Sequence, residues 1–325
     1  MVIVEEIGGA GAGRGNCYGT VDFNNLPEGC IANALSFTSP RDACRLSLIS
    51  STFRSAAESD AVWERFLPPD YQTIISAAAS FCPSSNTKKE LFRTLCEKPI
   101  LIDEGKMSFS LDKVSGKKCY MLCSRILFIV WGDTPRYWRW TSIPGARFNE
   151  VAELASVCWL EMRGWINSRM LSPSTLYGAY LVFKLTSGAC GFDYQAVEVC
   201  VGFVGGEAEK RRVYLDAERG RSLRYQIVPR PRRAGRFSRS RTHFATAVEA
   251  STPPHSHHRG NVDLQYPNDR ADGWLEVELG EFFIRGDEDK QLEMGVYEVK
   301  GGDWKGGLIV QGFEIRPKIN DNSSQ

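Results

Sequence analysis

The chain has 325 residues and a mass of 36.4 kDa, a length that predicts about two domains. Its composition, 42% hydrophobic and 24% charged with a net charge of +1, excludes a largely disordered chain. The longest apolar run, Ile126 to Trp131, is far shorter than the ~20 residues of a membrane helix, and the acidic N-terminus does not fit a secretion signal. We therefore expect a cytoplasmic or nuclear protein with reduced cysteines and no membrane contact.

Residues 1–21 are expected to form a flexible tail. Their run GGAGAGRG follows an apolar stretch, as the glycines of a phosphate-binding loop do. However, no Gly-Lys-Ser/Thr motif and no helical pattern follows it, so we do not expect a nucleotide site.

Residues 22–68 contain the start and stop signals of three short helices. Ser39 is expected to cap a helix that starts at Pro40 and places Asp42 in its first turn. The buried stripe of this helix is expected to consist of Ala43, Leu46 and Ile49.

A helical linker is expected over residues 69–117. Its clearest element is a helix from Thr87 to Glu97, which would bury Leu91 and Leu95.

Further along the chain the spacing of apolar residues changes from about 3.6 to 2, as expected for strands. The alternation is clearest over residues 181–185, 197–203, 275–279, 296–300 and 308–315. Short strands separated by Gly, Pro and Asp turns predict an antiparallel β-sandwich, jelly-roll-like, over residues 118–318, followed by a tail at 319–325. The fold class is therefore α+β, with a helical module ahead of a β domain.

An Arg-rich stretch at about residues 229–260 interrupts the β pattern and is expected to be a loop. An importin, nucleic acid, or phosphorylation at Ser238 or Ser240 are the alternatives, although the sequence as a whole does not favour nucleic acid as a partner. The HSHH run is too short and isolated to predict a metal site, so we expect no metal and no cofactor.

The segment LPEGCIANALSFTSPRDACRLSLISSTFRSAAESDAVWERFL resembles an F-box. Three short helices cannot bury all of its apolar residues, which favours a partner; the alternative is that they pack only against the β domain. The resemblance implies a Skp-type adaptor and, through it, the cullin of a ubiquitin ligase. The expected adaptor-binding residues are Leu26, Pro27, Ile31, Leu35, Pro40, Leu46, Phe53 and Trp63. Ala34 and Phe37 depart from the larger aliphatic residues usual at their positions.

The run WGDTPRYWRW, residues 131–140, gathers four aromatic residues and a carboxylate around a predicted turn. An indole offers a flat apolar face for the C–H face of a pyranose, and Asp133 can accept hydrogen bonds from sugar hydroxyls. The alternative is a hydrophobic cluster that closes one end of the sandwich, a role that suits Trp140.

Five segments between about residues 118 and 318 resemble the phloem protein 2 family, which includes the Nictaba-like lectins. They are KKCYMLCSRILFIVWGDTPRYWRW, FNEVAELASVCWLEMRG, LSPSTLYGAYLVFKL, DGWLEVELGEFF and GGLIVQGFEIRPK. The resemblance implies that Trp131 and Trp138 contact glycans containing N-acetylglucosamine, without calcium. We add Asp133, Tyr137 and Glu281 as candidate carbohydrate-binding residues.

Glu276, Glu278 and Glu281 could be interpreted as the paired carboxylates of a glycosidase. Their alternation with Leu275, Val277 and Leu279 is also typical of a solvated strand face. The family resemblance implies binding without hydrolysis, so we expect no enzymatic activity.

The sequence thus predicts a substrate-receptor subunit of a Skp-cullin-F-box ubiquitin ligase whose β domain captures a glycan or glycoprotein. One alternative is a phloem or stress lectin with a vestigial F-box. Another is an F-box receptor whose β domain binds a protein surface without sugar.

Overall fold

The computed structural model describes residues 26–78, 87–192, 195–216, 265–286 and 288–318. The predicted tails and the predicted Arg-rich loop lie outside the described residues. The helices come first in the chain and are α1 (Glu28–Leu35), α2 (Pro40–Leu46), α3 (Ser51–Glu58), α4 (Asp60–Phe66), α5 (Tyr71–Ser76) and α6 (Lys88–Glu97). We call residues 26–66 the helical module and residues 100–318 the β domain.

Side-chain caps set where the helices begin. The Ser39 hydroxyl accepts a hydrogen bond from the Asp42 amide at 3.1 Å, which confirms the predicted start of α2. Ser50 accepts one from the Phe53 amide at 3.2 Å and so starts α3 as a separate helix. Because of this second cap, four short helices form up to Phe66 instead of the three expected.

The linker differs from the expectation after its last helix. The predicted helix over residues 87–97 is present as α6, and Thr87 caps it by accepting a hydrogen bond from the Glu90 amide at 3.2 Å. The region up to residue 117 was expected to be helical, but residues 100–111 hold strands β1 and β2. These short strands pair with each other, and β2 pairs with β3, so cross-strand partners decide their conformation.

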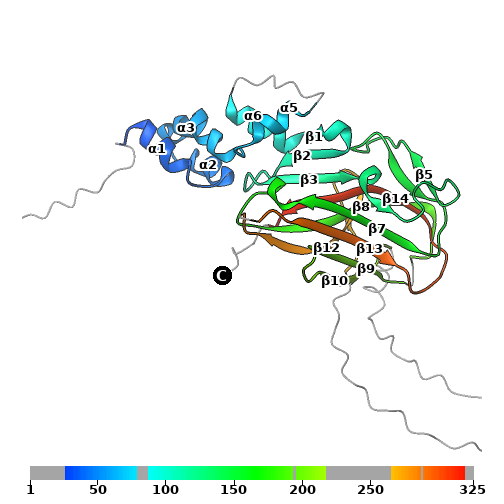
Figure 1. Ribbon diagram of the computed structural model, residues 1–325. Helices are drawn as coiled ribbons and strands as arrows, with labels where there is room; N and C mark the ends of the chain where they lie inside the picture. The colour runs from blue at the N-terminus through cyan, green and yellow to red at the C-terminus, as the bar shows by residue number, and fades with distance from the viewer. Residues whose placement is uncertain (1–25, 79–86, 193–194, 217–264, 287, 319–325) are drawn as a thin grey trace, which may run out of the picture.

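Two antiparallel sheets form the β domain, and together they confirm the predicted β-sandwich (Figure 1). The nine-stranded sheet contains β1 (Ile100–Ile102), β2 (Met107–Leu111), β3 (Lys118–Cys123), β5 (Trp138–Thr141), β6 (Val151–Leu154), β8 (Thr175–Cys190), β11 (Asn268–Asp269), β12 (Leu275–Ile284) and β14 (Gly306–Pro317). The five-stranded sheet contains β4 (Phe128–Ile129), β7 (Leu160–Asn167), β9 (Val197–Phe203), β10 (Glu209–Val213) and β13 (Gln291–Glu298). Three 3₁₀ turns among the described residues are Asp103–Gly105, Ser124–Ile126 and Ser168–Met170.

The strand order explains which side chains share a face. The larger sheet runs β1-β2-β3-β14-β8-β12-β11, with β6 joined to β14 and β5 joined to β6. The smaller sheet runs β10-β9-β13-β7-β4. The core lies between the sheets, where Phe313 of β14 packs close to Gly164 of β7. The alternating residues of each strand point away from this core; some of them, such as Met121 and Val182, are buried in a second apolar cluster, and the others face solvent.

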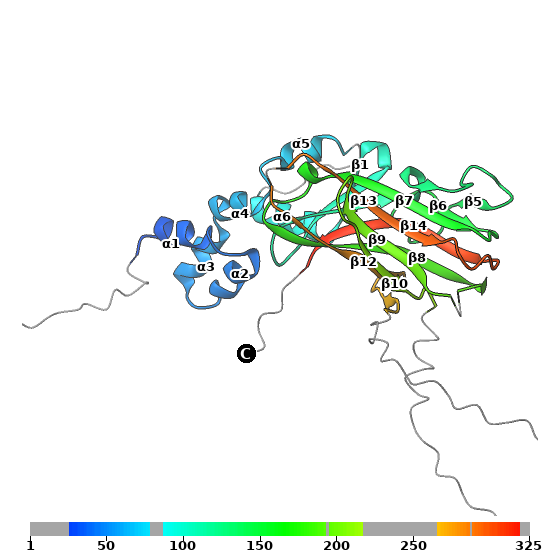
Figure 2. The same ribbon diagram turned by 60° about the horizontal axis from the view of Figure 1, so that its bottom comes forward.

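The helical module lies at one end of the sandwich, with α5 and α6 between it and strands β1 and β2 (Figures 1 and 2). The turn between β2 and β3 reaches back to the helices, and a Cβ on its Gly116 would lie 2.9 Å from the Phe66 carbonyl oxygen. The buried Lys118 ammonium pairs with Asp70, just before α5, at 2.7 Å. Apolar packing and this ion pair therefore connect the helices to the sandwich. Among the described residues, no helix has both the length and the apolar character needed to span a bilayer.

Candidate functional site

Most of the side chains expected to bind an adaptor build the interior of the helical module. Ile31, Leu35, Pro40 and Trp63 are buried, and Leu26, Leu46 and Phe53 are half-buried, whereas Pro27 is exposed. The Trp63 indole nitrogen donates a hydrogen bond to the Ala57 carbonyl at 2.7 Å. The surface that this module offers to a partner is therefore made largely by other residues.

Three large apolar side chains lie on that surface. Phe37 is 67% exposed, Leu48 is 77% exposed and Ile49 is 65% exposed. The prediction that Ile49 is buried is wrong, because α2 ends at Leu46 and the chain leaves its helical path there. The sequence pattern showed that Phe37 departs from the residue type usual at its position, but it did not predict that Phe37 or Leu48 is exposed. We call these three residues the exposed apolar set.

A groove of about 1100 Å³ lies between α2, α6 and the turn that joins β2 to β3. Leu48 and Trp63 contribute apolar surface to it. Its charged lining contains more basic than acidic groups, namely Arg41, Arg45, Lys89, Arg93 and Lys113 against Glu58, Glu90 and Glu97. We call it the module groove; its charge favours an amphipathic segment with acidic groups.

The predicted aromatic cluster forms a tight turn between β4 and β5, residues 130–137, which we call the aromatic turn. Two backbone hydrogen bonds of 2.9 Å close this turn. The Thr134 amide donates to the Trp131 carbonyl, and the Tyr137 amide donates to the Thr134 carbonyl. The rings of Trp131 and Tyr137 lie 5.1 Å apart at 36°. Trp131 is 43% exposed and has a φ of 57°, a left-handed conformation that a bulky residue rarely adopts. The turn thus presents an indole face at the surface at a conformational cost.

The structure contradicts the prediction that Trp138 stacks on a sugar. Its side chain is only 2% exposed, because in β5 it points into the core opposite Leu154 of β6. Trp140 is half-buried and donates a hydrogen bond to the Gly132 carbonyl at 3.2 Å, and the Arg125 guanidinium lies 3.8 Å from its ring centroid. Trp140 therefore supports the aromatic turn.

The remaining candidates lie in two different places. Asp133 is exposed on the aromatic turn, where its carboxylate is accessible. Glu281 lies on β12, which is separated from β5 by β8, β14 and β6. It forms an ion pair with Lys318 at 2.5 Å, and this hydrogen bond lowers the pKa of the Glu281 carboxyl. Glu281 therefore belongs to a different surface from the aromatic turn.

Ion pairs with arginines hold Glu276 of β12 and Glu314 of β14. Arg270 contacts Glu276 at 2.7 Å and Glu314 at 2.5 Å, and Arg316 contacts Glu276 at 2.5 Å. Arg147 contacts Glu314 at 3.0 Å. We call these five residues the charge network. Burial alone would raise the pKa of Glu276, but Arg316 and Arg270 outweigh it and hold the pKa below its usual value. Glu276 is therefore ionised at neutral pH and unsuited to act as a general acid.

The charge network predicts a loss of stability in acid. Burial would raise the pKa of Glu314 as well, yet the arginines hold it low, Arg147 and Arg270 above all. Because the folded-state pKa values of Glu276 and Glu314 lie below the unfolded value of about 4.3, their stabilisation is complete above that pH and is lost as the pH falls through the folded values. Urea unfolding measured between pH 7 and pH 3 should show this decrease. Glu314→Gln should lower the free energy of unfolding at pH 7 and make its fall with pH shallower; an unchanged slope would contradict the assignment.

Within the described ranges, no cluster of three or more His, Cys, Asp or Glu side chains has the arrangement needed to hold a metal ion. The arrangement on the β domain consists of an aromatic face, exposed hydrogen-bonding groups and compensated charges. Such groups can bind a polyhydroxy ligand through stacking and hydrogen bonds.

Comparison with known proteins finds a matching family for each part of the chain. The sequence profile of the phloem protein 2 family matches residues 117–317, and that of the F-box domain matches residues 23–65. The Arabidopsis thaliana F-box protein At2g02240 is 45% identical over 299 residues, which cover 92% of this chain and 81% of that protein. The F-box protein PP2-B1 of the same plant is 41% identical over 306 residues, 91% of this chain and 90% of that one.

Similarity to solved structures is much lower. The GH26-CBM35 β-(1,4)-mannanase of Podospora anserina aligns with a TM-score of 0.30 and 7% identity, over 62% of this chain and 28% of that one. A match with this TM-score does not indicate a shared ligand or a shared activity. The sequence relatives and the two matched profiles agree along most of the chain. The chain therefore belongs to the family of plant F-box proteins that carry a phloem protein 2 domain.

Proposed function

We propose that this chain is the substrate-receptor subunit of a Skp-cullin-F-box ubiquitin ligase. In this role the F-box docks a Skp-type adaptor, which links it to a cullin, and the β domain captures a glycan or glycoprotein. The chain performs no bond chemistry itself, since ubiquitin transfer belongs to its partners. The proposal places it in the cytoplasm or the nucleus.

The exposed apolar set supports adaptor binding. It lies on a helical module whose interior is already filled by other side chains. Phe37, Leu48 and Ile49 are each at least 65% exposed, whereas Ile31 and Leu35 are each 2% exposed. A protein of this size gains nothing in folding from large apolar side chains that stay in water, so their presence favours a partner that covers them.

The module groove fits the same partner. Leu48 belongs both to the exposed apolar set and to the lining of this groove. An adaptor segment with one apolar face and acidic groups would bury Leu48 and pair with Arg41, Arg45 and Arg93 at the rim. Co-purification of the full chain with a recombinant Skp-type adaptor and a cullin tests this part directly. Failure of the chain to retain the adaptor would favour a lectin with a vestigial F-box.

The glycan part is supported by the aromatic turn. A non-glycine residue in the left-handed region costs about 1–3 kcal/mol, and such strain is found at binding sites because the surrounding structure maintains it. At Trp131 this conformation places an indole on the surface beside Tyr137, with Asp133 exposed on the same turn. These three residues are the glycan contacts that we propose.

Substitution of Trp131 separates binding from folding. Both Trp131→Gly and Trp131→Ala should abolish binding to N-acetylglucosamine oligomers, because the stacking face is lost. Glycine adopts a positive φ without steric cost, so Trp131→Gly should unfold at a temperature equal to or above that of Trp131→Ala. Titration calorimetry and thermal unfolding measure the two effects. Wild-type affinity is expected between millimolar and micromolar and should persist in EDTA.

A matched control is Trp304→Ala, which removes another exposed indole of the β domain, 59% exposed, and should leave binding unchanged. Glycan binding that survives both Trp131 substitutions would place the site elsewhere. A folded wild-type domain that binds no glycan on an array would favour recognition of a protein surface.

A further inference from the structure

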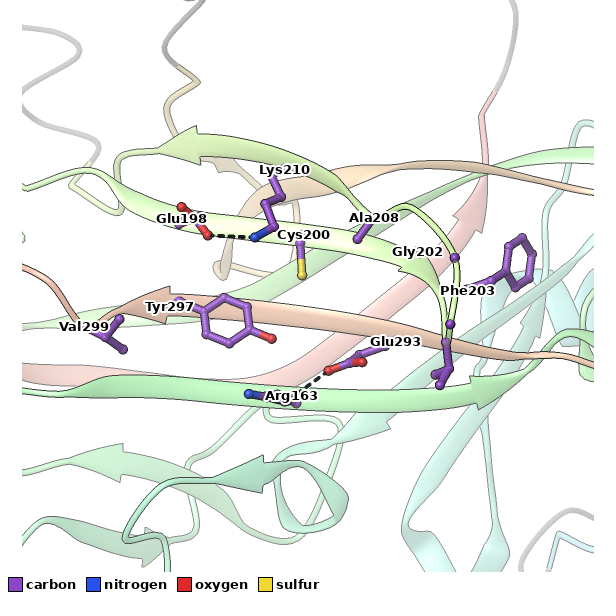
Figure 3. A pocket seen from close by; sticks show the side chains of 13 residues that line it. Arg163, Glu198, Cys200, Gly202, Phe203, Ala208, Lys210, Glu293, Tyr297 and Val299 are labelled. Atoms are coloured by element: carbon purple, nitrogen blue, oxygen red, sulfur yellow. Dashed lines mark hydrogen bonds and ion pairs between the residues drawn. The ribbon is translucent and has the colours of Figure 1, made fainter.

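A second groove, of about 370 Å³, lies on the outer face of the five-stranded sheet (Figure 3). Strands β7, β13 and β9 form its floor, and the turn over residues 204–208 forms one wall. Its side chains alternate along the strands with core residues such as Val199 and Val296, so they point away from the sandwich interior. We call it the sheet groove, and the side chains that matter below are Arg163, Glu198, Cys200, Lys210, Glu293 and Tyr297.

The floor of the sheet groove is an aromatic ring lying along the sheet. A Cβ on Gly295 would overlap Cε2 and Oη of Tyr297, so the absence of a side chain at Gly295 lets the ring lie flat across the strand. The Arg163 guanidinium carbon on β7 lies 5.5 Å from the centre of this ring and borders it on one side. Figure 3 shows this ring between Cys200 and Arg163. The groove therefore has a flat, partly apolar floor of fixed orientation.

The central strand of the groove floor, β13, has no open edge to offer a peptide strand. β13 is paired on one side with β7, through Gly295 and Arg163, and on the other side with β9, through Gly295 and Cys200. A ligand here must therefore be recognised by side chains, since addition of a strand requires an unpaired edge.

The charged groups of the groove compensate one another. Arg163 lies 3.5 Å from Glu293 and Lys210 lies 3.6 Å from Glu198, so two cations face two carboxylates. This balance does not favour a phosphate ester or a cationic ligand. At these distances a guanidinium with five donors and a carboxylate with about four acceptor positions retain hydrogen-bonding capacity. Neighbouring donors and acceptors of this kind suit the vicinal hydroxyls of a neutral ligand.

We propose that the sheet groove binds one pyranose ring of a neutral glycan. The C–H face of the sugar lies over Tyr297, and its hydroxyls bond to Arg163, Glu293 and the Lys210–Glu198 pair. The inference rests on the proposed glycan capture for its ligand class, while the groove itself shares no lining residue with the aromatic turn.

The sheet groove and the aromatic turn border the same strand. The Val130 amide, beside Trp131, donates to the Glu161 carbonyl of β7 at 3.0 Å. The Glu161 carboxylate holds the Arg163 guanidinium at 2.6 Å, and Arg163 lines the groove. Glu161 and Arg163 are two positions apart on β7, about 7 Å, with only Met162 between them. The aromatic turn therefore starts beside the strand that forms one edge of the sheet groove.

The test blocks the groove with a bulky side chain and keeps every hydrogen-bonding group of its lining. Ala208 is exposed at the groove wall, so Ala208→Trp blocks the ring site, whereas Glu207→Trp adds the same side chain outside the lining. The full chain is titrated with N,N′,N″-triacetylchitotriose and applied to an array of neutral oligosaccharides. Ala208→Trp should weaken binding at least tenfold, and Glu207→Trp should stay within twofold of wild type. Glu293→Gln, which preserves shape, should weaken binding severalfold, with thermal unfolding reported for every variant.

The outcomes separate this inference from the glycan part of the proposed function. Loss of binding in Trp131→Gly, with Ala208→Trp and Glu293→Gln unaffected, would overturn the sheet groove and leave the aromatic turn as the site. Loss in Ala208→Trp, with Trp131→Gly unaffected, would support the groove and remove the aromatic turn. A folded wild-type chain that binds none of the saccharides would overturn the groove as a sugar site, whatever its affinity for the adaptor.

Discussion

Replacing Leu48 and Ile49 together by aspartate should reduce the affinity for a Skp-type adaptor by about a hundredfold to ten-thousandfold. Burial of one large aliphatic side chain contributes roughly 1.5–3 kcal/mol, and the two contributions together correspond to about two to four decades in Kd. Both side chains are largely exposed in the free chain, 77% for Leu48 and 65% for Ile49, so stability should change by only about 0.5 kcal/mol. Titration with recombinant adaptor and thermal unfolding measure the two quantities on the same samples.

The matched control is Phe283→Asp, which places the same charge at an apolar residue of β12 that is 51% exposed. It should leave adaptor binding unchanged, because β12 belongs to the β domain. Wild-type affinity in the Leu48→Asp, Ile49→Asp double variant would show that the adaptor docks on another face of the F-box.

Substitution of Lys305 by methionine should destabilise the β domain by about 3–5 kcal/mol. Lys305 is completely buried, and its ammonium pairs with the Glu298 carboxylate and donates to the Asp303 carbonyl at 2.7 Å. Removal of one partner leaves a carboxylate that is 6% exposed without its counter-charge, which is the costly way to break such a pair. For a domain of this size, we expect the unfolding temperature to fall by roughly 6–20 °C, as measured by calorimetry.

Two further variants identify the cause of that loss. Lys305→Met combined with Glu298→Leu should recover much of the stability, because neither charge is then left buried alone. Lys300→Met removes a lysine that is 80% exposed and pairs with Glu198 at 3.9 Å, so it should have almost no effect. Equal stability of Lys305→Met and wild type would contradict the importance of the buried pair.

Features that depend on neighbours within a few residues were predicted well from the sequence. Ser39 and Thr87 cap their helices through amides three residues further along the chain, so the pattern itself contains both partners. The alternation over residues 197–203 corresponds to the whole of β9. Both families were also predicted, because their motifs are runs of adjacent residues.

Features that depend on distant partners were missed or wrong. Strands β1 and β2 are too short to show a pattern of their own and are stabilised by pairing within the sheet. Trp138 occurs in an aromatic run in which Trp131 is exposed and Trp140 is half-buried, and its own burial depends on β6, which pairs with β5 from residues 151–154. The sheet groove had no sequence signal, because its lining comes from β7, β9, β10 and β13, which are far apart in the chain.

The division follows from the range of the interactions. Local sequence accounts for the helix starts, the period of the strands and the order of the two domains, since each arises from contacts within a few residues. A period of two shows that neighbouring side chains lie on opposite faces, but it does not show which face meets the other sheet. Packing of the two sheets decides that Trp138 is core and that Tyr297 faces outward, and the end of α2 leaves Leu48 and Ile49 exposed. The burial of apolar area across the whole domain selects among these arrangements, and no short segment contains that information.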